Sequence, residues 1–412
     1  MKLKELQIKL KSLLSPNINY DNLIVQLGLN QSCNGKCKFC SINKLIEAET
    51  QKMPKKWIYE YLKPLYPKMS LMSLTFGEAT MYEDNFEFAK WICENYKNIT
   101  LLIETNGIAF DEKWQKLACE NLFFVHFSLN SISPELYQET VWDAPEGGDV
   151  AYKKIINNFE NYLKLLKEKN MEEFNPSCSM VINKDTYKQT FDFLEMAMKY
   201  KVKYCCLFLD AKETELREEN NEYSKDIYEI IKNLLEIERL IYDKFFINFK
   251  LFIPEEKLSS LEKEVYVEDI EELKIKHKKY VELAKDRDIW AEYYKRKGKR
   301  EKDGKKPLEL GEDFRLVTPL HKNNDGKLVC FSPWKQIRIM PSGLIDMCLF
   351  RWDEKIRIQN IKNSWNKVFN GFWYKYHRSI FEKCNYRGCP QNCAQKYQTN
   401  NYKFLENKEL RR

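Results

Sequence analysis

The sequence has few histidines and no long apolar run. Only four of its 412 residues are His, and none of them pairs convincingly with a carboxylate as a catalytic acid or base. No apolar stretch is long enough to cross a bilayer. The first residues, Met1–Leu14, form a Lys-rich amphipathic pattern before Pro16 and do not resemble a signal peptide. We therefore expect a cytoplasmic protein without a membrane partner.

The composition is that of a globular protein. Hydrophobic residues make up 43% of the chain and aromatics 14%, which is enough for a sizeable core and for two domains. There are 13 cysteines. Without a secretion signal, this number favours reduced thiols and metal ligation over a disulfide framework.

The net charge of +7 comes mostly from one segment. Lys295–Lys306 contains eight basic and two acidic residues, so the rest of the chain is nearly neutral. A basic run flanked by Gly298 and Gly304 predicts a solvated loop more than a nucleic-acid or anionic-partner site.

The most informative stretch is Gln31–Cys40, where Cys33, Cys37 and Cys40 form a C-x3-C-x2-C pattern. Thiolates favour iron–sulfur or zinc sites. A cubane needs four ligands, so three cysteines leave one iron open. Structural zinc also needs four ligands, and no further Cys or His lies close to this loop in sequence.

This spacing resembles the signature of the radical SAM superfamily. The resemblance implies a 4Fe-4S cluster on the three cysteines and S-adenosylmethionine (SAM) on the fourth iron. It also places Phe39 near the adenine, although Phe39 could equally be a buried aromatic that closes the loop. A flavodoxin- or ferredoxin-type reductant is expected to supply the electron.

Strands and helices alternate after the first segment, which predicts an α/β fold with parallel strands and right-handed crossovers. Radical SAM enzymes are similar, since their core is a partial (β/α)6 barrel. The predicted strands are Asn22–Leu29, Leu71–Phe76, Thr100–Glu104, Leu122–Leu129, Pro176–Ile182 and Lys203–Leu209. The predicted helices are Trp57–Tyr66, Asn85–Asn98, Asp111–Asn121, Tyr152–Lys169 and Thr186–Tyr200.

The second predicted strand ends at Gly77 and Glu78, where the family carries a Gly-Gly-Glu-Pro-like motif. The match is partial, because Phe76 and Ala79 depart from the commonest form. Glycine permits close backbone approach, and a carboxylate can pair with a ligand ammonium. The resemblance implies that this segment holds the amino group of SAM; otherwise Glu78 is an ordinary loop residue.

The fourth predicted strand ends with Ser128 and Asn130, which alternate to one face. This ending resembles the family's Ser-x-Asp/Asn pattern, so the two residues are candidates to bond the ribose and carboxylate of SAM. Alternatively, they contribute to capping the helix that starts at Ser133. Thr105 and Asn106 have less weight, because Thr-Asn-Gly is equally a turn.

Five other cysteines fit a simpler interpretation. We expect them to be small buried apolar residues without a metal; they are Cys93, Cys119, Cys178, Cys205 and Cys206.

The sequence divides into four parts. We predict an N-terminal helix in residues 1–21, the core barrel in 22–211, a helical insertion with the basic loop in 212–328, and a cysteine-rich extension in 329–412. The insertion matches nothing that we recognise. Its helical stretches, Ile227–Phe245 and Glu256–Ala291, flank a strand-like Phe246–Ile253.

The extension begins with a C-x12-G-x4-C pattern formed by Cys330, Gly343 and Cys348, around a predicted β-hairpin. This pattern resembles the SPASM and twitch extensions, which carry auxiliary 4Fe-4S clusters. The tail has five cysteines, not the seven of a full SPASM domain. One auxiliary cluster is expected on Cys330, Cys348 and Cys393, with Cys389 preferred over Cys384 as the fourth ligand. Structural zinc is the alternative.

The predicted function is that of a radical SAM enzyme acting on a small molecule, such as a sugar, or on a peptide. An auxiliary cluster favours net oxidation or cross-linking. The alternatives are a non-catalytic Fe–S electron carrier, a SAM-binding sensor and, from a different class, a zinc-stabilised nucleic-acid-binding protein.

Overall fold

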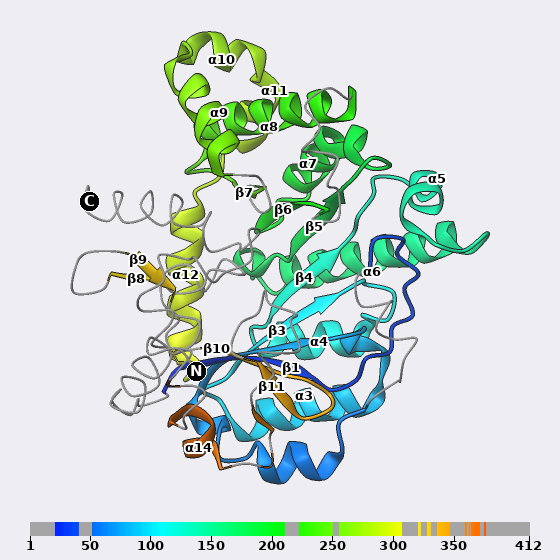
Figure 1. Cartoon of the computed structure of the whole chain (residues 1–412), viewed down its shortest axis with the longest axis vertical. Helices are drawn as coiled ribbons and strands as arrows, with labels where there is room; N and C mark the ends of the chain where they lie inside the picture. Colours follow the sequence, from blue (N-terminus) through cyan, green and yellow to red (C-terminus); the bar gives the residue numbers. More distant parts are fainter. Residues whose placement is uncertain are drawn as a thin grey trace, which may run out of the picture. The chain divides into compact units, whose positions relative to one another are not determined.

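The structure is a computed structural model, whose helices and strands are labelled in Figure 1. The chain forms two compact units. The first comprises Met1–Ser32, Lys44–Ile103 and Arg300–Arg412; the second comprises Cys33–Asn43 and Glu104–Lys299. Within them the structure describes residues 21–40, 52–210, 222–249, 255–306, 320–322, 328–330, 336–346, 359–360, 362, 364–370 and 375. The predicted N-terminal helix lies outside these residues.

The first unit is built on parallel strands. β1 (Leu23–Gly28) pairs with β2 (Met69–Thr75), and β2 pairs with the start of β3 (Thr100–Thr105). Between β2 and β3 lies α3 (Glu83–Asn95). The strands are almost continuously apolar because helix and sheet neighbours bury both of their faces.

The predicted hairpin extends this sheet. β10 (Gln336–Ile339) and β11 (Leu344–Asp346) pair antiparallel, as predicted, with Gly343 at a φ of +79° in the turn. Its position was not predicted: β10 pairs parallel with β1, and β12 (Gln359–Asn360) pairs with β11. A separate pair is formed by β8 (Leu320–Lys322) and β9 (Leu328–Cys330), and α14 spans Trp365–Asn370.

The second unit continues the alternation. Its parallel strands are β4 (Phe124–Ser128), β5 (Ser177–Ile182), β6 (Tyr204–Leu209) and β7 (Phe246–Asn248). The helices are α4 (Glu112–Glu120), α5 (Pro134–Leu136), α6 (Gly148–Glu168) and α7 (Thr190–Lys199). The α/β fold with mostly parallel strands, typical of a partial radical SAM barrel, is confirmed.

Two details of the predicted core differ. Trp57–Tyr66 is not one helix: Trp57–Tyr61 is a π-helical turn, and a 3-10 turn follows at Tyr66–Lys68. Pro64 explains the break, because proline cannot supply the amide that a continuing helix needs. The strand-like segment at Phe246 pairs with β6, so the parallel strands do not stop at β6.

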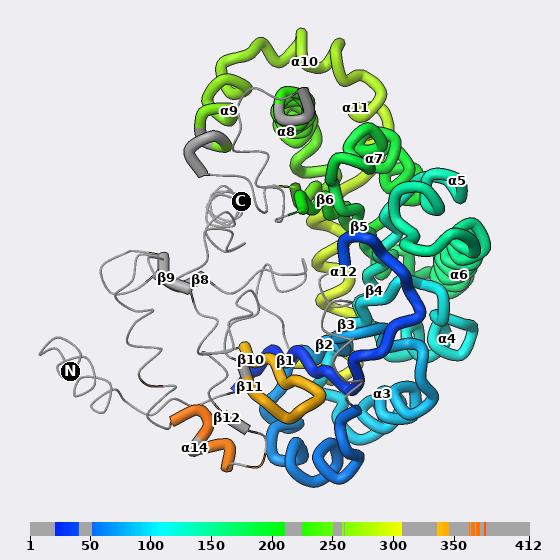
Figure 2. Tube along the Cα trace, turned by 45° about the vertical axis from the view of Figure 1, so that its right-hand side comes forward, coloured from blue at the N-terminus to red at the C-terminus, as the bar shows by residue number. Residues whose placement is uncertain are grey.

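The insertion is arranged around α8 (Glu222–Ile241), and Figure 2 shows the next three helices beside it. They are α9 (Glu255–Val267), α10 (Ile270–Lys276) and α11 (Lys278–Ala284). Buried Glu236 on α8 accepts hydrogen bonds from His277 Nε2 at 2.5 Å and Lys276 Nζ at 2.6 Å. One histidine therefore does pair with a carboxylate, which the sequence did not indicate. Arg239 donates to the carbonyls of Val265 and Glu268, at the end of α9.

The basic run is not the solvated loop that we predicted. Lys295 to Lys302 belong to α12 (Ile289–Lys302). Lys and Arg are strong helix formers, and helical spacing buries Tyr293, Arg296 and Arg300. The side chains of Lys295, Lys297 and Lys302 are exposed. In the part of the chain that the structure describes, no helix combines the length and apolar character needed to span a membrane.

Tyr162 on α6 shows how the second unit is packed. Its side chain is fully buried and its ring meets Phe110 edge-on, with centroids 5.3 Å apart. Its hydroxyl has no hydrogen-bond partner among the described residues. Burying an unpaired hydroxyl is unfavourable, so the ring stabilises this site and the hydroxyl does not.

We therefore expect Tyr162→Phe to raise the free energy of unfolding by about 1 kcal/mol. Tyr162→Ala, which also removes the ring, should lower it by about 3–5 kcal/mol. Urea denaturation of the metal-free protein measures both values. A destabilised Tyr162→Phe variant would show that the hydroxyl makes a needed bond.

Candidate active site

The three cysteines of the predicted cluster loop follow β1 in the chain and are all partly exposed. Gly35 lies between the first two. A Cβ built on Gly35 would be 3.3 Å from Cys33 Sγ and 3.8 Å from Cys37 Sγ, so both sulfurs flank the same backbone point. The amide of Cys40 donates to the carbonyl of Cys37 at 3.1 Å, which closes a tight turn. The loop therefore brings the thiols of Cys33 and Cys37 together, and the Cys40 backbone follows in the same turn.

A second segment of the same unit holds this loop; we call Tyr137–Asp143 the clasp. Trp142 forms an antiparallel bridge with Cys37, and the amide of Lys38 donates to the carbonyl of Val141 at 2.9 Å. Asp143 N donates to the carbonyl of Lys36. These backbone bonds fix the middle of the cysteine loop.

The clasp begins with a π-helical turn, Tyr137–Val141. Such turns are rare and frequently occur at functional sites. Gln138 anchors it: its Oε1 accepts from the amide of Gly148 at 2.7 Å, and its Nε2 donates to the carbonyl of Ala144 at 2.8 Å. Buried Tyr137 lies close to the loop. Burial raises the pKa of its hydroxyl strongly, and the nearby Cys37 and Cys33 raise that pKa further.

Gly77 and Glu78 contact the residue directly before Cys33, within the first unit. The amide of Glu78 donates to the carbonyl of Ser32 at 2.9 Å. Gly77 has a φ of +66°, and a Cβ on it would lie 2.8 Å from the carbonyl carbon of Gln31 and 2.9 Å from that of Ser32. Only glycine fits this position, which explains the glycine that the sequence pattern singled out.

The carboxylate of Glu78 is buried, with 2% of the residue exposed. Its Oε1 accepts from Thr80 N at 3.1 Å and from Thr80 Oγ1 at 2.5 Å, so Glu78 caps the short turn Ala79–Met81. These bonds orient the carboxylate. An oriented, buried carboxylate is suited to receive an ammonium group.

Phe76, one of the two departures from the commonest motif, is also in the left-handed region, with a φ of +67°. Its ring packs so closely on Gly28 that a Cβ there would lie 2.6 Å from Phe76 Cδ2. The guanidinium of Arg338 lies over the same ring at 5.6 Å. Phe76 thus joins the end of β2 to β1 and β10.

Ser128 and Asn130 lie at the end of β4, as predicted. Asn130 has a φ of +61°, and its Nδ2 donates to the carbonyl of Ser128 at 3.1 Å. Its Oδ1 accepts from Val181 N at 3.1 Å. The amide nitrogen therefore bonds back to β4, and the amide oxygen ties this strand end to β5. The helix start is capped by Ser133 itself, whose Oγ accepts from Leu136 N.

Asn106, the weaker candidate in the sequence analysis, contacts the cysteine loop. Its Nδ2 donates to Asn34 Oδ1 at 2.8 Å and to Cys33 Sγ at 3.5 Å. Thr105 closes the turn, because its Oγ1 accepts from Gly107 N at 2.9 Å. The sequence pattern missed the clasp and Gly35 entirely. Nothing in the sequence pairs the clasp with the cysteines.

The loop offers three thiols, which is the number that a cubane with one open iron takes. In the described ranges, no three side chains of Cys, His, Asp or Glu converge around a single metal position. A cubane binds each thiolate through a different iron, so it needs thiols spread along one loop. Phe39 is half-buried beside them.

The five cysteines predicted to be structural are buried, as expected. Burial raises the pKa of Cys93 to about 11 and raises that of Cys205 strongly, so these groups remain neutral thiols. Of the tail cysteines, Cys330 ends β9; the other four lie outside the described residues, as does every tail thiol group.

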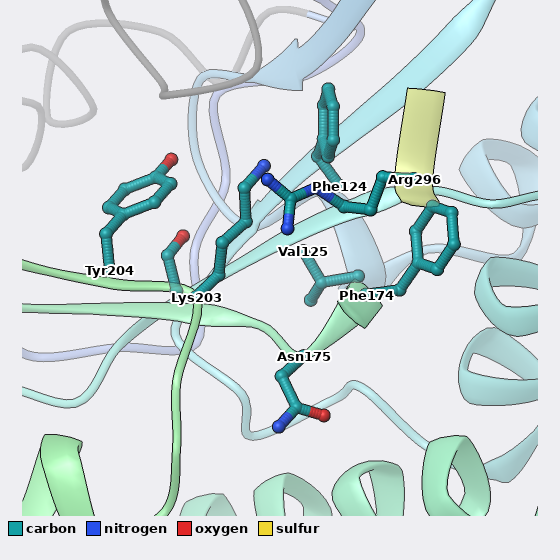
Figure 3. A pocket seen from close by; sticks show the side chains of 8 residues that line it. Phe124, Val125, Phe174, Asn175, Lys203, Tyr204 and Arg296 are labelled. Atoms are coloured by element: carbon teal, nitrogen blue, oxygen red, sulfur yellow. The ribbon is translucent and has the colours of Figure 1, made fainter. Parts of the chain in front are cut away.

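A small cavity in the second unit lies away from these residues, at the N-terminal ends of β4, β5 and β6 (Figure 3). The ammonium of Lys203 and the guanidinium of Arg296 point toward one another there, and Lys203 Nζ lies 3.9 Å from the centre of the Phe124 ring. Parallel α/β folds place their chemistry at the opposite strand ends. None of the predicted site residues lines this cavity.

Comparison with known proteins agrees with this geometry. Residues 29–197 match the sequence model of the Radical SAM superfamily. That range contains the cysteine loop, Gly77, Glu78, Asn106, the clasp and Asn130.

Two curated relatives are FeMo cofactor biosynthesis proteins NifB. The one from Methanocaldococcus infernus is 27% identical over 161 residues, which cover 36% of this chain and 51% of the relative. The one from Methanocaldococcus jannaschii is 26% identical over 129 residues, covering 28% and 43%. The chain thus spans about half the length of the curated relatives it matches.

Solved structures share the fold. Streptococcus suis SuiB bound to S-adenosylmethionine has a TM-score of 0.54 at 15% identity, covering 96% of this chain and 76% of that one. The anSMEcpe protein with bound AdoMet has a TM-score of 0.52 at 16% identity, covering 90% and 85%. SuiB bound to precursor peptide SuiA has a TM-score of 0.51 at 15% identity, covering 96% and 75%.

The position of Gly77 generates a prediction. In Gly77→Ala, the left-handed conformation costs about 1–2 kcal/mol before any steric overlap, so we expect at least about tenfold weaker SAM binding and a poorer cluster yield. Equilibrium dialysis and iron analysis measure these two quantities.

Gly298→Ala is the matched control, because nothing lies within 4 Å of a Cβ there and Gly298 is inside α12. It should bind SAM as the parent does and gain about 0.5–1 kcal/mol of stability. Equal SAM affinity in Gly77→Ala and the parent would contradict the assigned role of Gly77.

Proposed function

We propose that the radical SAM core of this chain cleaves S-adenosylmethionine reductively and uses the product to abstract a hydrogen atom from a substrate. The observation that carries the proposal is the cysteine loop. Cys33 and Cys37 flank Gly35, and backbone bonds from the clasp hold the loop.

Cys33, Cys37 and Cys40 would hold a 4Fe-4S cluster and leave one iron for SAM. When bound and given one electron, the cluster and SAM would supply the reductive cleavage of SAM to methionine and a 5'-deoxyadenosyl radical. The protein's own residues would bind SAM and orient it. Glu78 would receive the amino group of SAM, with Gly77 giving the backbone room to approach.

The other predicted contacts are less direct. Phe39 would lie near the adenine. Ser128 and Asn130 would face the ribose and carboxylate, although the side chain of Asn130 also braces β5. Packing of the surrounding helices would keep water from the radical.

A peptide is the substrate class that we favour, and a small molecule such as a sugar is the alternative. The support is the fold shared with SuiB, whose structure with a precursor peptide has a TM-score of 0.51. The insertion around α8 is where substrate contacts would differ from those of other proteins with this core. The reductant would be a flavodoxin- or ferredoxin-type protein.

An auxiliary 4Fe-4S cluster would accept the second electron of a net oxidation or cross-linking. We propose Cys330, Cys348, Cys393 and Cys389 as its ligands, with Cys384 as the alternative to Cys389. The resemblance to SPASM and twitch extensions supports it, and so does the hairpin with Gly343 in its turn. Zinc on the same thiolates remains the competing assignment.

The central test is 5'-deoxyadenosine release by anaerobically reconstituted, dithionite-reduced protein. We expect release by the parent and none by a variant with Cys33, Cys37 and Cys40 all changed to Ala. If a parent protein with intact clusters releases none, even with candidate peptides added, the enzyme assignment fails in favour of an electron carrier or a SAM-binding sensor.

The auxiliary cluster has its own test. Changing Cys330 and Cys348 to Ala should lower iron per chain by about half and leave the loop cluster able to bind SAM, because the two sites use different thiolates. Metal analysis of the variant and parent measures this. Unchanged iron with a loss of zinc would instead favour the zinc site.

A further inference from the structure

We propose that Asn106 is a positioning residue that sets the reduction potential of the loop cluster through an N–H···S hydrogen bond to Cys33, together with the amide of Gly35. This inference rests on the proposed function, because it needs a cluster on the loop. In the sequence, Asn106 could be explained by the Thr-Asn-Gly turn alone, so a role at the cluster is an additional assignment.

Two donors reach the same sulfur. Gly35 N donates to Cys33 Sγ at 3.2 Å, and Asn106 Nδ2 donates to it at 3.5 Å. Asn106 Nδ2 also donates to Asn34 Oδ1 at 2.8 Å. One amide group therefore links the end of β3 to both Cys33 and its neighbour.

The orientation of the Asn106 amide is fixed by the backbone. Its Oδ1 accepts from Ile108 N at 3.0 Å. Because a backbone N–H can only donate, the oxygen must face Ile108 and the NH2 group must face the cysteine loop. The donor at Cys33 is thus determined by the chemistry of the turn.

Gly35 leaves the room that this arrangement needs. A Cβ on residue 35 would lie 3.2 Å from Asn106 Nδ2 and 3.3 Å from Cys33 Sγ, both tighter than ordinary contact. Any side chain there would press on the donor or the acceptor. The hydrogen bond from the Asn106 amide to Cys33 therefore depends on the absence of a side chain at Gly35.

The direction of the effect follows from charge. Reduction adds an electron to the cluster and raises the negative charge on its thiolates, and an N–H donor stabilises the more negative state. Hydrogen bonds to the sulfurs are one of the factors that set Fe–S potentials. Removing the Asn106 donor should therefore make the loop cluster harder to reduce.

The test compares Asn106→Leu and Asn106→Asp with the parent, by redox titration of the reconstituted full chain followed by EPR without SAM. The EPR signal of the loop cluster is identified as the one that is missing when Cys33, Cys37 and Cys40 are all changed to Ala. We expect the reduction equilibrium constant to fall up to tenfold, which for one electron is about 59 mV. Asn106→Asp, which keeps an oxygen for Ile108 N but replaces the donor, should shift in the same direction.

Asn183→Leu is the matched control. Asn183 also follows a parallel strand and caps a turn, with Oδ1 accepting from Asp185 N at 2.9 Å and Thr186 N at 3.1 Å. The loop cluster of the Asn183→Leu variant should have the same reduction potential as that of the parent.

The outcomes separate this inference from the proposed function. Unchanged potentials in both Asn106 variants, with the loop cluster present, would overturn the role of Asn106 even if the parent cleaves SAM. A lowered potential in a protein that never releases 5'-deoxyadenosine would support the role of Asn106 and refute the enzyme. If Asn106→Leu loses the cluster, the potential of Asn106→Ala decides, because this variant removes the donor without adding a charge.

Discussion

The rest of the candidate site depends on keeping the backbone of Gln31–Cys40 in place, because these residues form neither helix nor strand. Backbone groups outside the loop do this. Glu78 N bonds to the carbonyl of Ser32, and the clasp bonds to Lys36 and Lys38. Main-chain bonds suit this task, since they do not use the cysteine side chains. The glycines follow from the same constraint: Gly77 and Gly35 stand where a side chain would displace either the loop or a group that bonds to it.

Local patterns predicted the core well. The apolar runs at Leu23–Gly28 and Met69–Thr75 became parallel strands, and the helices between strands followed from their 3.6-residue periodicity. The cysteine spacing and Gly77 could be recognised from the sequence for a related reason, because each meets a local requirement. A cubane would need three thiols close together in the chain, and a left-handed backbone favours glycine. These features need no knowledge of distant segments.

Features that depend on distant pairing were not predictable. The bridge between Cys37 and Trp142, and the pairing of β10 with β1, join segments far apart in sequence without a shared pattern. The basic run was misassigned for a different reason. Its charge suggested solvent, but the helix buries Arg296, whose Nη1 donates to the carbonyl of Glu173 at 3.0 Å, while Lys295 Nζ pairs with the Glu173 carboxylate at 3.0 Å. A charged side chain with such partners can be buried, and partners cannot be counted from sequence.

Asn106 and Asn130 illustrate how the same residue type at two strand ends acquires different roles. Pattern matching favoured Asn130, yet both polar atoms of its amide bond to the backbone of β4 and β5. Asn106 also uses its oxygen on the backbone, but its nitrogen faces the cysteine loop. An amide has one acceptor and one donor end, and a backbone N–H always takes the acceptor. Once the oxygen is bonded to the backbone, only the NH2 group can contact another part of the site. In Asn106 this group donates to Cys33 Sγ.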